Sequence, residues 1–348
     1  SALNAFSPDN TIAYFENIGL RLKTERGGRI FPVSDKSSDV TAALCRRLNQ
    51  LGVEVKLQEK VLNIKYDNER ISKVITDKNT YEPDSVILAT GGLSYPLTGS
   101  TGDGYRFAKQ SGHTLITPRP ALCPINLDGV FDVSGNTISL EKLPLPTGLS
   151  LLNVTASVKE KGKAKPIASE FGELLFTHTG LSGPTILTIS SLINRKNIID
   201  LQLSIDLKPA LSHEMLDKRI LRDFSSLSNK QFKNALDALL PKSLIPYIIK
   251  LSNIEPNAYV HSITKEQRAG LVNLFKSLNF SILSLGTQDA AIVTAGGIAV
   301  NEIQPSTMRS KLIENLYFAG EIIDVDGFTG GYNIQIALST GRLAGKSV

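Results

Sequence analysis

The sequence predicts an α/β nucleotide-binding domain that is interrupted by a β-rich and helical insertion. Apolar runs that end in glycine occur near both ends of the chain, and short proline-punctuated runs lie between them. A chain of 348 residues is also long enough for two domains. We expect residues 1–117 and 291–348 to form one domain and residues 118–290 to form the insertion, with a helical piece at about 212–278.

The first part opens with a helix and a meander. Residues 37–51 place apolar side chains at helical spacing, Ser38 or Asp39 can cap this helix, and Gly52 ends it. Short alternating runs separated by polar turns follow and suit an antiparallel meander; they cover residues 53–57, 61–66 and 71–76.

Three later apolar runs lead directly into glycines. They are residues 85–90 before Gly91-Gly92, residues 290–295 before Gly296-Gly297, and residues 316–319 before Gly320-Glu321. Continuous apolar runs of this length are typical of strands buried on both faces of a sheet. We expect the first and the last of these runs to belong to one central sheet.

The middle of the chain has a different sequence pattern. Prolines break it at 118, 120, 124, 144 and 146, and strand-like runs then cover residues 149–158 and 173–176. Helical patterns cover residues 216–251 and 265–278. The insertion should therefore be β-rich first and helical later.

Composition excludes several classes of protein. With 41% hydrophobic residues the chain is near the globular average, and no apolar run approaches the ~20 residues that a membrane helix needs. The net charge is +5, but the basic residues are scattered, which disfavours a nucleic-acid partner. No signal peptide is visible in residues 1–6. We expect a soluble, cytoplasmic protein with a small-molecule substrate and no membrane partner; the sequence predicts no oligomeric state.

The strongest candidate site follows the last apolar run. A strand that ends in Gly320 lets a ligand approach the backbone, and Glu321 can accept hydrogen bonds from sugar-type hydroxyls, which suits the ribityl chain of a flavin. Gly330 and Gly331 then open a helix at about 333–343, whose N-terminus favours negative charge. An ordinary strand, turn and helix is the alternative interpretation.

A second strand that ends in glycines, Ala89-Thr-Gly-Gly92, is followed by a loop rich in glycine, serine and threonine up to Tyr105. Such a loop offers backbone donors and small hydroxyls to a phosphate or to the edge of a flavin ring, although a capped flexible loop would look the same. The predicted cofactor-binding residues are Val61, Thr90, Gly91, Gly92, Gly320, Glu321, Asp324, Gly330, Gly331, Tyr332, Asn333, Ile334 and Gln335.

Catalytic and metal-binding residues are harder to predict. His178 is the catalytic candidate, because it could line the substrate side, and a structural histidine next to a turn is the alternative. The other histidines, and Cys45 and Cys123, lack the spacing of metal ligands, so no metal site is expected. There is also no nucleophile elbow and no Walker loop, which argues against hydrolase and P-loop chemistry.

Several blocks together resemble one family, and they span nearly the whole chain in order. They are Gly28-Arg-Ile-Phe-Pro-Val-Ser34, Ala89-Thr-Gly-Gly-Leu-Ser-Tyr-Pro96, Thr98-Gly-Ser-Thr-Gly-Asp-Gly104, Leu175-Phe-Thr-His-Thr-Gly-Leu-Ser-Gly-Pro184, Thr294-Ala-Gly-Gly297 and Gly320-Glu-Ile-Ile-Asp-Val-Asp-Gly-Phe-Thr-Gly-Gly-Tyr-Asn-Ile-Gln335. The sequence resembles the bacterial NAD(P)/FAD-dependent oxidoreductases, which include aminoacetone oxidase-like enzymes and a bile-acid reductase.

This resemblance implies a glutathione-reductase-like FAD-binding domain with an inserted β-barrel-like and helical domain. It also implies FAD as the cofactor, with NAD(P)H as a possible electron donor. Family members carry a strand, a GxGxxG turn and a helix, and later a Thr-Gly-x-Gly-Arg-Cys-Asn segment, and neither occurs in these residues. We therefore expect an FAD domain that is incomplete at its N-terminus, and a chain that by itself binds FAD poorly and is inactive.

The predicted function is hydride transfer between FAD and either a small amine or hydroxy/keto compound or NAD(P)H. In such enzymes the cofactor carries the chemistry and the protein supplies placement and electrostatics. A truncated or degenerate flavoprotein that acts as a non-catalytic binding module is the alternative. A flavoprotein that acts on RNA is a third interpretation, suggested by the isoelectric point near 9.0.

Overall fold

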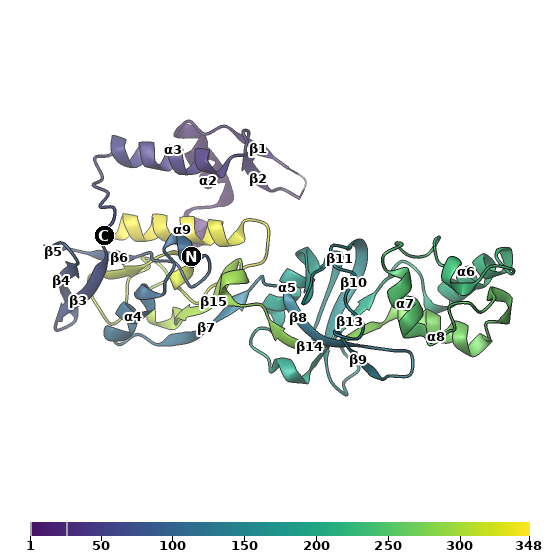
Figure 1. Cartoon of the computed structure of the whole chain (residues 1–348). Helices are drawn as coiled ribbons and strands as arrows, with labels where there is room; N and C mark the ends of the chain where they lie inside the picture. Colours follow the sequence, from purple (N-terminus) through teal and green to yellow (C-terminus); the bar gives the residue numbers. More distant parts are fainter. Residues whose placement is uncertain (1, 26) are drawn as a thin grey trace. The chain divides into compact units, whose positions relative to one another are not determined.

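The computed structural model describes residues 2–25 and 27–348. The chain folds into two compact units (Figure 1). Unit 1 combines Ser1–Arg119 with Val293–Val348, and unit 2 is Pro120–Ile292.

Unit 1 is an α/β unit, and its helices and strands come from both ends of the chain (Figure 1). They are α1 (Ala2–Ala5), α2 (Pro8–Asn17), β1 (Leu22–Thr24), β2 (Ile30–Pro32), α3 (Ser37–Gln50), β3 (Val61–Asp67), β4 (Arg70–Thr76), β5 (Thr80–Tyr81), β6 (Val86–Leu88), α4 (Asp103–Gln110), β7 (Leu115–Ala121), β15 (Val293–Ile298), β16 (Leu316–Phe318) and α9 (Tyr332–Ser347).

A parallel pair of strands joins the two ends of the chain in unit 1. β6 and β16 pair with Val86 opposite Leu316 and Leu88 opposite Phe318, so the two apolar runs share a sheet as the sequence predicted. All three residues of β16 are buried. Asn315 ties the meander to this pair, because its side chain donates to the carbonyl oxygen of Ile71 at 3.0 Å and accepts from the Ile71 N–H at 2.8 Å.

The meander is shorter than predicted. Strands β3, β4 and β5 form an antiparallel sheet, whereas Val53–Leu57 belongs to no strand of the described residues. Val53, Val55 and Leu57 are all exposed, and Leu57 reaches 79%. The predicted strand at 53–57 is therefore wrong, because no neighbouring strand hydrogen-bonds the segment and no core covers its apolar side chains.

The helix predicted at 37–51 is present as α3, with a different capping residue. Lys36 occupies the N-cap position without a side-chain hydrogen bond, and Asp39 lies in the first turn. The expectation that Ser38 or Asp39 caps the helix is therefore wrong, because both residues already lie in the first turn and the N-cap is two residues before Ser38. Ala43 is fully buried on the apolar face.

The strand β15 contains its glycines instead of ending at them. Gly296 and Gly297 have φ values of +87° and +133°, which favour glycine. A Cβ on Gly296 would lie 2.5 Å from the carbonyl oxygen of Thr117 on β7, and one on Gly297 would lie 2.5 Å from that of Ile322. Neighbouring backbone therefore packs closer to β15 than a side chain would allow.

Unit 2 is a barrel with helices. Its elements are β8 (Ile125–Phe131), β9 (Thr137–Ser139), β10 (Ser150–Glu160), β11 (Ala168–Phe176), β12 (Gly180–Ser182), α5 (Pro184–Ile193), β13 (Leu201–Asp206), α6 (His213–Ser226), α7 (Ile245–Ser252), α8 (Lys265–Lys276) and β14 (Leu278–Leu285). Six strands close in the order β12, β11, β10, β13, β14, β8 and back to β12, and β9 extends the sheet beside β8. The predicted β-barrel-like insertion is thus a six-stranded antiparallel barrel.

Closure of the barrel depends on a glycine. Gly180 pairs with Asn126 and Leu181 with Ile125 where β12 meets β8. A Cβ on Gly180 would collide with the backbone oxygen of Ile125. The short strand can therefore approach β8 only without a side chain at this position.

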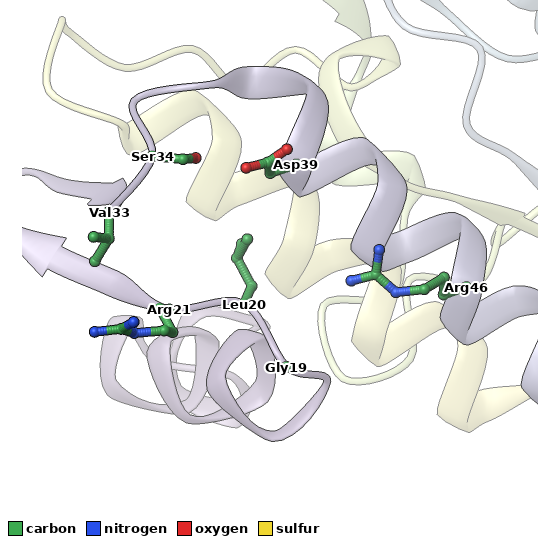
Figure 2. A pocket seen from close by; sticks show the side chains of 7 residues that line it. All are labelled: Gly19, Leu20, Arg21, Val33, Ser34, Asp39 and Arg46. Atoms are coloured by element: carbon green, nitrogen blue, oxygen red, sulfur yellow. The ribbon is translucent and has the colours of Figure 1, made fainter.

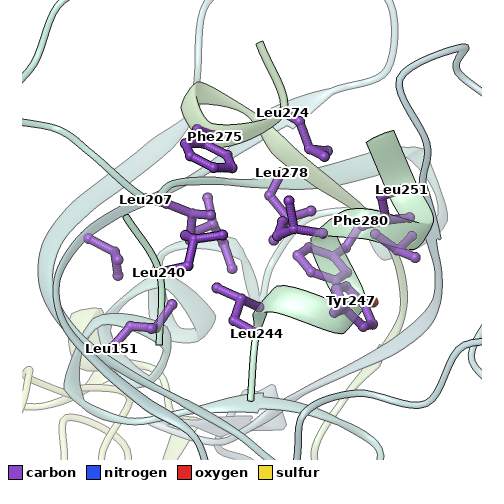
Figure 3. Close-up of a cluster of buried hydrophobic side chains, with 14 of the residues drawn as sticks. Leu151, Leu207, Leu240, Leu244, Tyr247, Leu251, Leu274, Phe275, Leu278 and Phe280 are labelled. Atoms are coloured by element: carbon purple, nitrogen blue, oxygen red, sulfur yellow. The ribbon is translucent and has the colours of Figure 1, made fainter. Parts of the chain in front are cut away.

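Alternating side chains fill the barrel. Leu201, Leu203 and Ile205 of β13 point inward and are at most 1% exposed. Figure 3 shows how side chains of this core, including Phe275 and Phe280, pack with Leu residues of neighbouring segments.

The helical pattern predicted over 216–251 forms two separate helices instead of a continuous one. The chain forms α6 and α7, with only a short 3-10 turn at Phe232–Asn234 between them. Leu236 and Leu240 are buried although they lie outside both helices. Pro241 cannot donate a helical hydrogen bond, so this apolar spacing covers the core as a loop.

Candidate functional site

The glycines that follow two neighbouring strands lie at one edge of a sheet in unit 1. Because β6 and β16 are parallel, their carboxyl ends lie at the same edge of the sheet. Gly91-Gly92 follows β6, and Gly320-Glu321 follows β16. The structure therefore brings together residues from positions about 230 apart in sequence, at the place where α/β sheets bind ligands.

Gly92 forms a cradle beside a carboxylate. A Cβ on Gly92 would lie 2.5 Å from the Thr294 Oγ1 and 2.6 Å from the Glu321 Oε1. The Glu321 Oε1 in turn accepts a hydrogen bond from the Thr294 N–H at 3.0 Å. Only glycine leaves room for both side chains, so the Gly-Gly pair has a packing role in addition to any ligand role.

Thr294 connects three segments of the site. Its Oγ1 accepts hydrogen bonds from the backbone N–H groups of Leu93 at 2.8 Å and Ser94 at 3.1 Å, and lies 3.1 Å from the Ser94 Oγ. Thr294 is 1% exposed and Ser94 is 4% exposed. One buried hydroxyl therefore fixes the loop after β6, while the backbone of the same residue orients Glu321.

Opposing effects act on the pKa of the Glu321 carboxyl group. Burial raises the pKa of this carboxyl, hydrogen bonds from Thr294 lower it, and the nearby Asp326 raises it. The net pKa shift is upward. A carboxylate held in this way is a poor neighbour for an anion and a good acceptor for hydroxyl groups.

Tyr105 adds a buried hydroxyl to the same region. Its Oη has no hydrogen-bond partner among the residues that the structure describes, and the side chain is only 5% exposed. Burial raises the pKa of Tyr105, and the carboxylates of Glu321 and Asp324 raise it further. The hydroxyl therefore stays protonated and can donate one hydrogen bond.

The start of α9 is open to a ligand. Gly330 and Gly331 have φ values of +121° and +91°, and no side chain caps the helix. The Asn333 side chain closes the preceding loop, because it accepts from the Gly327 N–H and donates to the Gly327 carbonyl, both at 2.8 Å. Tyr332 and Ile334 are 61% and 68% exposed. The helix begins one residue before the predicted start and runs to Ser347.

Three predicted cofactor residues have side chains that are engaged within the protein. The Gln335 amide donates to the Phe6 carbonyl at 2.9 Å and accepts from the Thr11 hydroxyl at 3.0 Å, which holds α9 to the N-terminal helices. Val61 begins β3 and packs against the core of unit 1. The Thr90 hydroxyl lies against Gly104, where a Cβ would collide with it.

The histidines occupy different environments. His178 lies in unit 2, in the turn between β11 and β12, and is exposed; its ring makes no hydrogen bond to the described residues, so the alternative of a satisfied structural histidine is wrong. His113 is buried in unit 1 between the Ser111 Oγ at 2.8 Å and the Ser310 Oγ at 2.7 Å. Burial lowers the pKa of His113. Among residues 2–25 and 27–348 no cluster of His, Cys, Asp and Glu could hold a metal ion.

Sequence reasoning missed Thr294, Ser94 and Tyr105 as site residues. Thr294 stands directly before the Ala-Gly-Gly of β15, and a hydroxyl residue within an otherwise apolar run was the available signal. Tyr105 follows the glycine-rich loop that the prediction did single out.

A separate pocket of about 440 Å³ lies elsewhere in unit 1 (Figure 2). Arg21, Arg46 and Asp39 line it together with Gly19, Leu20, Val33 and Ser34. None of these residues lies at the ends of β6 and β16 or at the start of α9, so this pocket is distinct from the candidate site.

The fold and the site together define a Rossmann-type nucleotide-binding protein with an inserted barrel. Residues 1–347 match the family described as HI0933-like protein Rossmann domain, and the chain belongs to this family of FAD-binding flavoprotein oxidoreductases. The resemblance seen in the sequence is thereby confirmed. None of the described helices is both long enough and apolar enough to cross a membrane.

Curated relatives match almost the whole chain. A 3-dehydro-bile acid delta(4,6)-reductase of Clostridium scindens is 29% identical over 350 residues, which cover 100% of this chain and 81% of the relative. A ribosomal RNA dihydrouridine synthase of Haemophilus influenzae is 27% identical and covers the same shares. The ribosomal RNA dihydrouridine synthase of Escherichia coli is 28% identical over 98% of this chain and 79% of its own length.

Proposed function

We propose that the protein is an FAD-dependent reductase that adds a hydride from NAD(P)H and a proton across a carbon–carbon double bond conjugated to a carbonyl. The observation that carries the proposal is the convergence of Gly92, Thr294 and Glu321 at the shared edge of β6 and β16, because this geometry leaves backbone and one carboxylate open to a polyhydroxylated ligand.

The residues at the site fit FAD. Glu321 and the glycine backbone at 320 would hold the ribityl hydroxyls, because a buried carboxylate accepts O–H bonds well. The uncapped start of α9 would hold the electron-rich edge of the ring, since helix N-termini favour negative charge. When bound, FAD supplies the hydride relay between NAD(P)H and the substrate. The protonated Tyr105 hydroxyl supplies a further donor at the same edge.

The named activities of the relatives share one type of chemistry. A delta(4,6)-reductase of a 3-dehydro-bile acid and a dihydrouridine synthase both saturate a ring double bond that is conjugated to a carbonyl group. The net charge of +5 favours a polyanionic substrate over a free steroid. We therefore propose a uracil ring in RNA as the substrate. The substrate class predicted from the sequence, a small amine or hydroxy/keto compound, stays a prediction.

Two further expectations from the sequence stay predictions as well: that these 348 residues alone retain FAD poorly and are inactive, and that the protein is cytoplasmic. The non-catalytic alternative is separated from the enzyme by a single measurement, which is the anaerobic bleaching of the flavin absorbance by NADH or NADPH.

The direct test uses the purified full-length protein, FAD, NAD(P)H and ribosomal RNA from a strain that lacks the gene. Mass spectrometry of digested RNA should show a uridine that has gained two hydrogens, in an amount matched by NAD(P)H consumed. A conjugated steroid ketone serves as the second substrate. If NAD(P)H reduces the flavin and neither substrate is saturated, the proposed double-bond chemistry is wrong.

A further inference from the structure

The outer face of three barrel strands in unit 2 carries rows of hydroxyl side chains. β11, β10 and β13 lie side by side, and their registers place Ser169, Ser157 and Ser204 in one row. The Ser157 and Ser169 hydroxyl oxygens are 2.9 Å apart. The next row consists of Phe171, Thr155 and Asp206. The face is thus rich in hydroxyls, with one aromatic ring.

The contribution of Phe171 to folding does not explain an aromatic residue at this position. Its side chain is 62% exposed, and Leu152 close by is 64% exposed. A hydroxyl residue would serve the solvent side of a strand as well, because burial supplies most of what an aromatic side chain contributes to folding. Unpaired bases stack on exposed aromatic rings of this kind on the face of a sheet.

A basic groove adjoins the ring. Phe171, Asn153, Lys208 and Arg219 line a groove of about 850 Å³, together with Leu207, Pro209, Ala210 and Leu211. Burial lowers the pKa of Lys208, and the positive charge of Arg219 lowers it further, so the two cations are near one another. An anion between them would relieve this repulsion.

The charges next to the groove are unevenly neutralised. Arg219 donates through Nε to Asp223 at 2.9 Å, which uses one of the five N–H groups of its guanidinium. The Lys208 Nζ has no hydrogen-bond or ion-pair partner in the described part of the chain. Asp206 on the same face is paired with the Lys276 Nζ at 2.6 Å. Glu173 is the exposed carboxylate nearest along β11.

The opposite end of the face is also basic. Lys159 pairs in register with Gln202, four residues along β10 from Thr155, which places it roughly 13 Å from the Phe171 row. Lys161 and Lys165 follow in the loop between β10 and β11. This spacing exceeds the length of one nucleotide, so the face can follow a strand of several phosphates.

We propose that the outer face of β10, β11 and β13 binds single-stranded RNA, with a base stacked on Phe171 and phosphates held by Lys208 and Arg219. The proposal rests on the proposed function for its choice of RNA over other polyanions. The sequence disfavoured nucleic acid because its basic residues are scattered, and the fold gathers Lys159, Lys208 and Arg219 onto one face.

Binding is tested with the purified protein and a fluorescently labelled single-stranded oligouridine RNA, by anisotropy at low and moderate salt. F171A should weaken binding roughly tenfold through the lost stacking. K208A should weaken binding and reduce the salt dependence by roughly 0.7 in the log–log slope, as expected for one lost phosphate contact. Y259A is the matched control, since Tyr259 is an aromatic of unit 2 that is 52% exposed and does not line the groove.

Circular dichroism should be unchanged for all three variants, because the substituted side chains are exposed or half-buried. Wild-type protein that does not bind the RNA at low salt overturns the proposal, and so does equal affinity of F171A, K208A and wild type. Phe171-dependent binding of a steroid carboxylate without RNA binding would instead make the groove an apolar carboxylate site. NAD(P)H-dependent flavin reduction should be the same in F171A, so a failure of the proposed reaction is separable from a failure of this surface.

Discussion

Replacement of Thr294 by valine should loosen the loop that follows β6. Valine has nearly the same shape as threonine but no hydroxyl, so the N–H groups of Leu93 and Ser94 lose their acceptor. The Thr294 side chain is 1% exposed, and water therefore cannot replace it without opening the structure. The change removes hydrogen bonds while it preserves the packing.

The cost follows from the burial of the two donors. A buried N–H group left without a partner costs about 1–3 kcal/mol. The Ser94 N–H is buried and should cost the full amount, whereas the Leu93 N–H is partly buried and should cost less. We expect a total loss of about 2–4 kcal/mol in the free energy of unfolding of unit 1, a large share of the ~5–15 kcal/mol typical of a domain.

Urea unfolding followed by far-ultraviolet circular dichroism measures this loss, because the chain contains no tryptophan for fluorescence. T294S is the control: it keeps the hydroxyl and loses one methyl group, which costs about 1 kcal/mol. Hydrogen exchange with mass spectrometry should show faster exchange in residues 91–95 of T294V alone. A T294V protein as stable as T294S, with unchanged exchange in this segment, would refute the role given to the hydroxyl.

Three further changes probe other parts of the molecule. In the full-length protein, E321A should raise the dissociation constant for FAD roughly 10- to 100-fold and E321Q less, as measured by calorimetry, since a charge-assisted bond is worth ~1.5–3 kcal/mol; unaltered FAD retention would exclude the ribityl role. The folded-state pKa of His113 is lowered, so the unfolded chain binds more protons, and stability should fall as the pH drops below about 6.5; H113N should lack this dependence in urea titrations, and equal slopes would contradict it. G180A should destabilise unit 2 by about 3 kcal/mol or more because of the backbone clash, whereas G270A should stabilise it slightly, since a Cβ within α8 would only make ordinary contact with Val133 at 3.7 Å; similar melting of both variants would contradict the role given to Gly180 in closing the barrel.

The strands that end in glycine could be predicted because each carries its signal locally. A continuous apolar run followed by glycine has few structural interpretations, and the pairing of β6 with β16 followed from recognising the same pattern twice. The start of α9 was predicted within one residue for a similar reason, since Gly330-Gly331 is a helix-opening signal. By contrast, Val53–Leu57 has the alternating pattern of a strand and no partner strand in this structure, and a local pattern cannot supply a partner.

The hydrogen bonds that organise the site could not be predicted. Thr294 meets Leu93 and Ser94 across about 200 residues of sequence, and no local rule joins one threonine among many to a particular pair of N–H groups. Tyr105 was passed over for a related reason: its unpartnered hydroxyl becomes visible only when the neighbouring side chains are placed around it. A hydroxyl residue within an apolar strand is therefore as strong an indication of the site as the glycines that end the strands.

The basic face of unit 2 shows how strand register produces a surface that composition hides. Alternation along β10 sends Val154, Ala156 and Val158 into the barrel core, so the residues between them must face outward whatever their type. The antiparallel registers then align those outward positions with the matching ones on β11 and β13, and a lysine at 159 comes onto the same face as Phe171. The core residues thus dictate which polar residues are neighbours. A one-residue slip of β10 would bury Ser157 and Lys159 in the barrel, so the hydrophobic core that closes the barrel also maintains the spacing between its basic groups and its exposed ring.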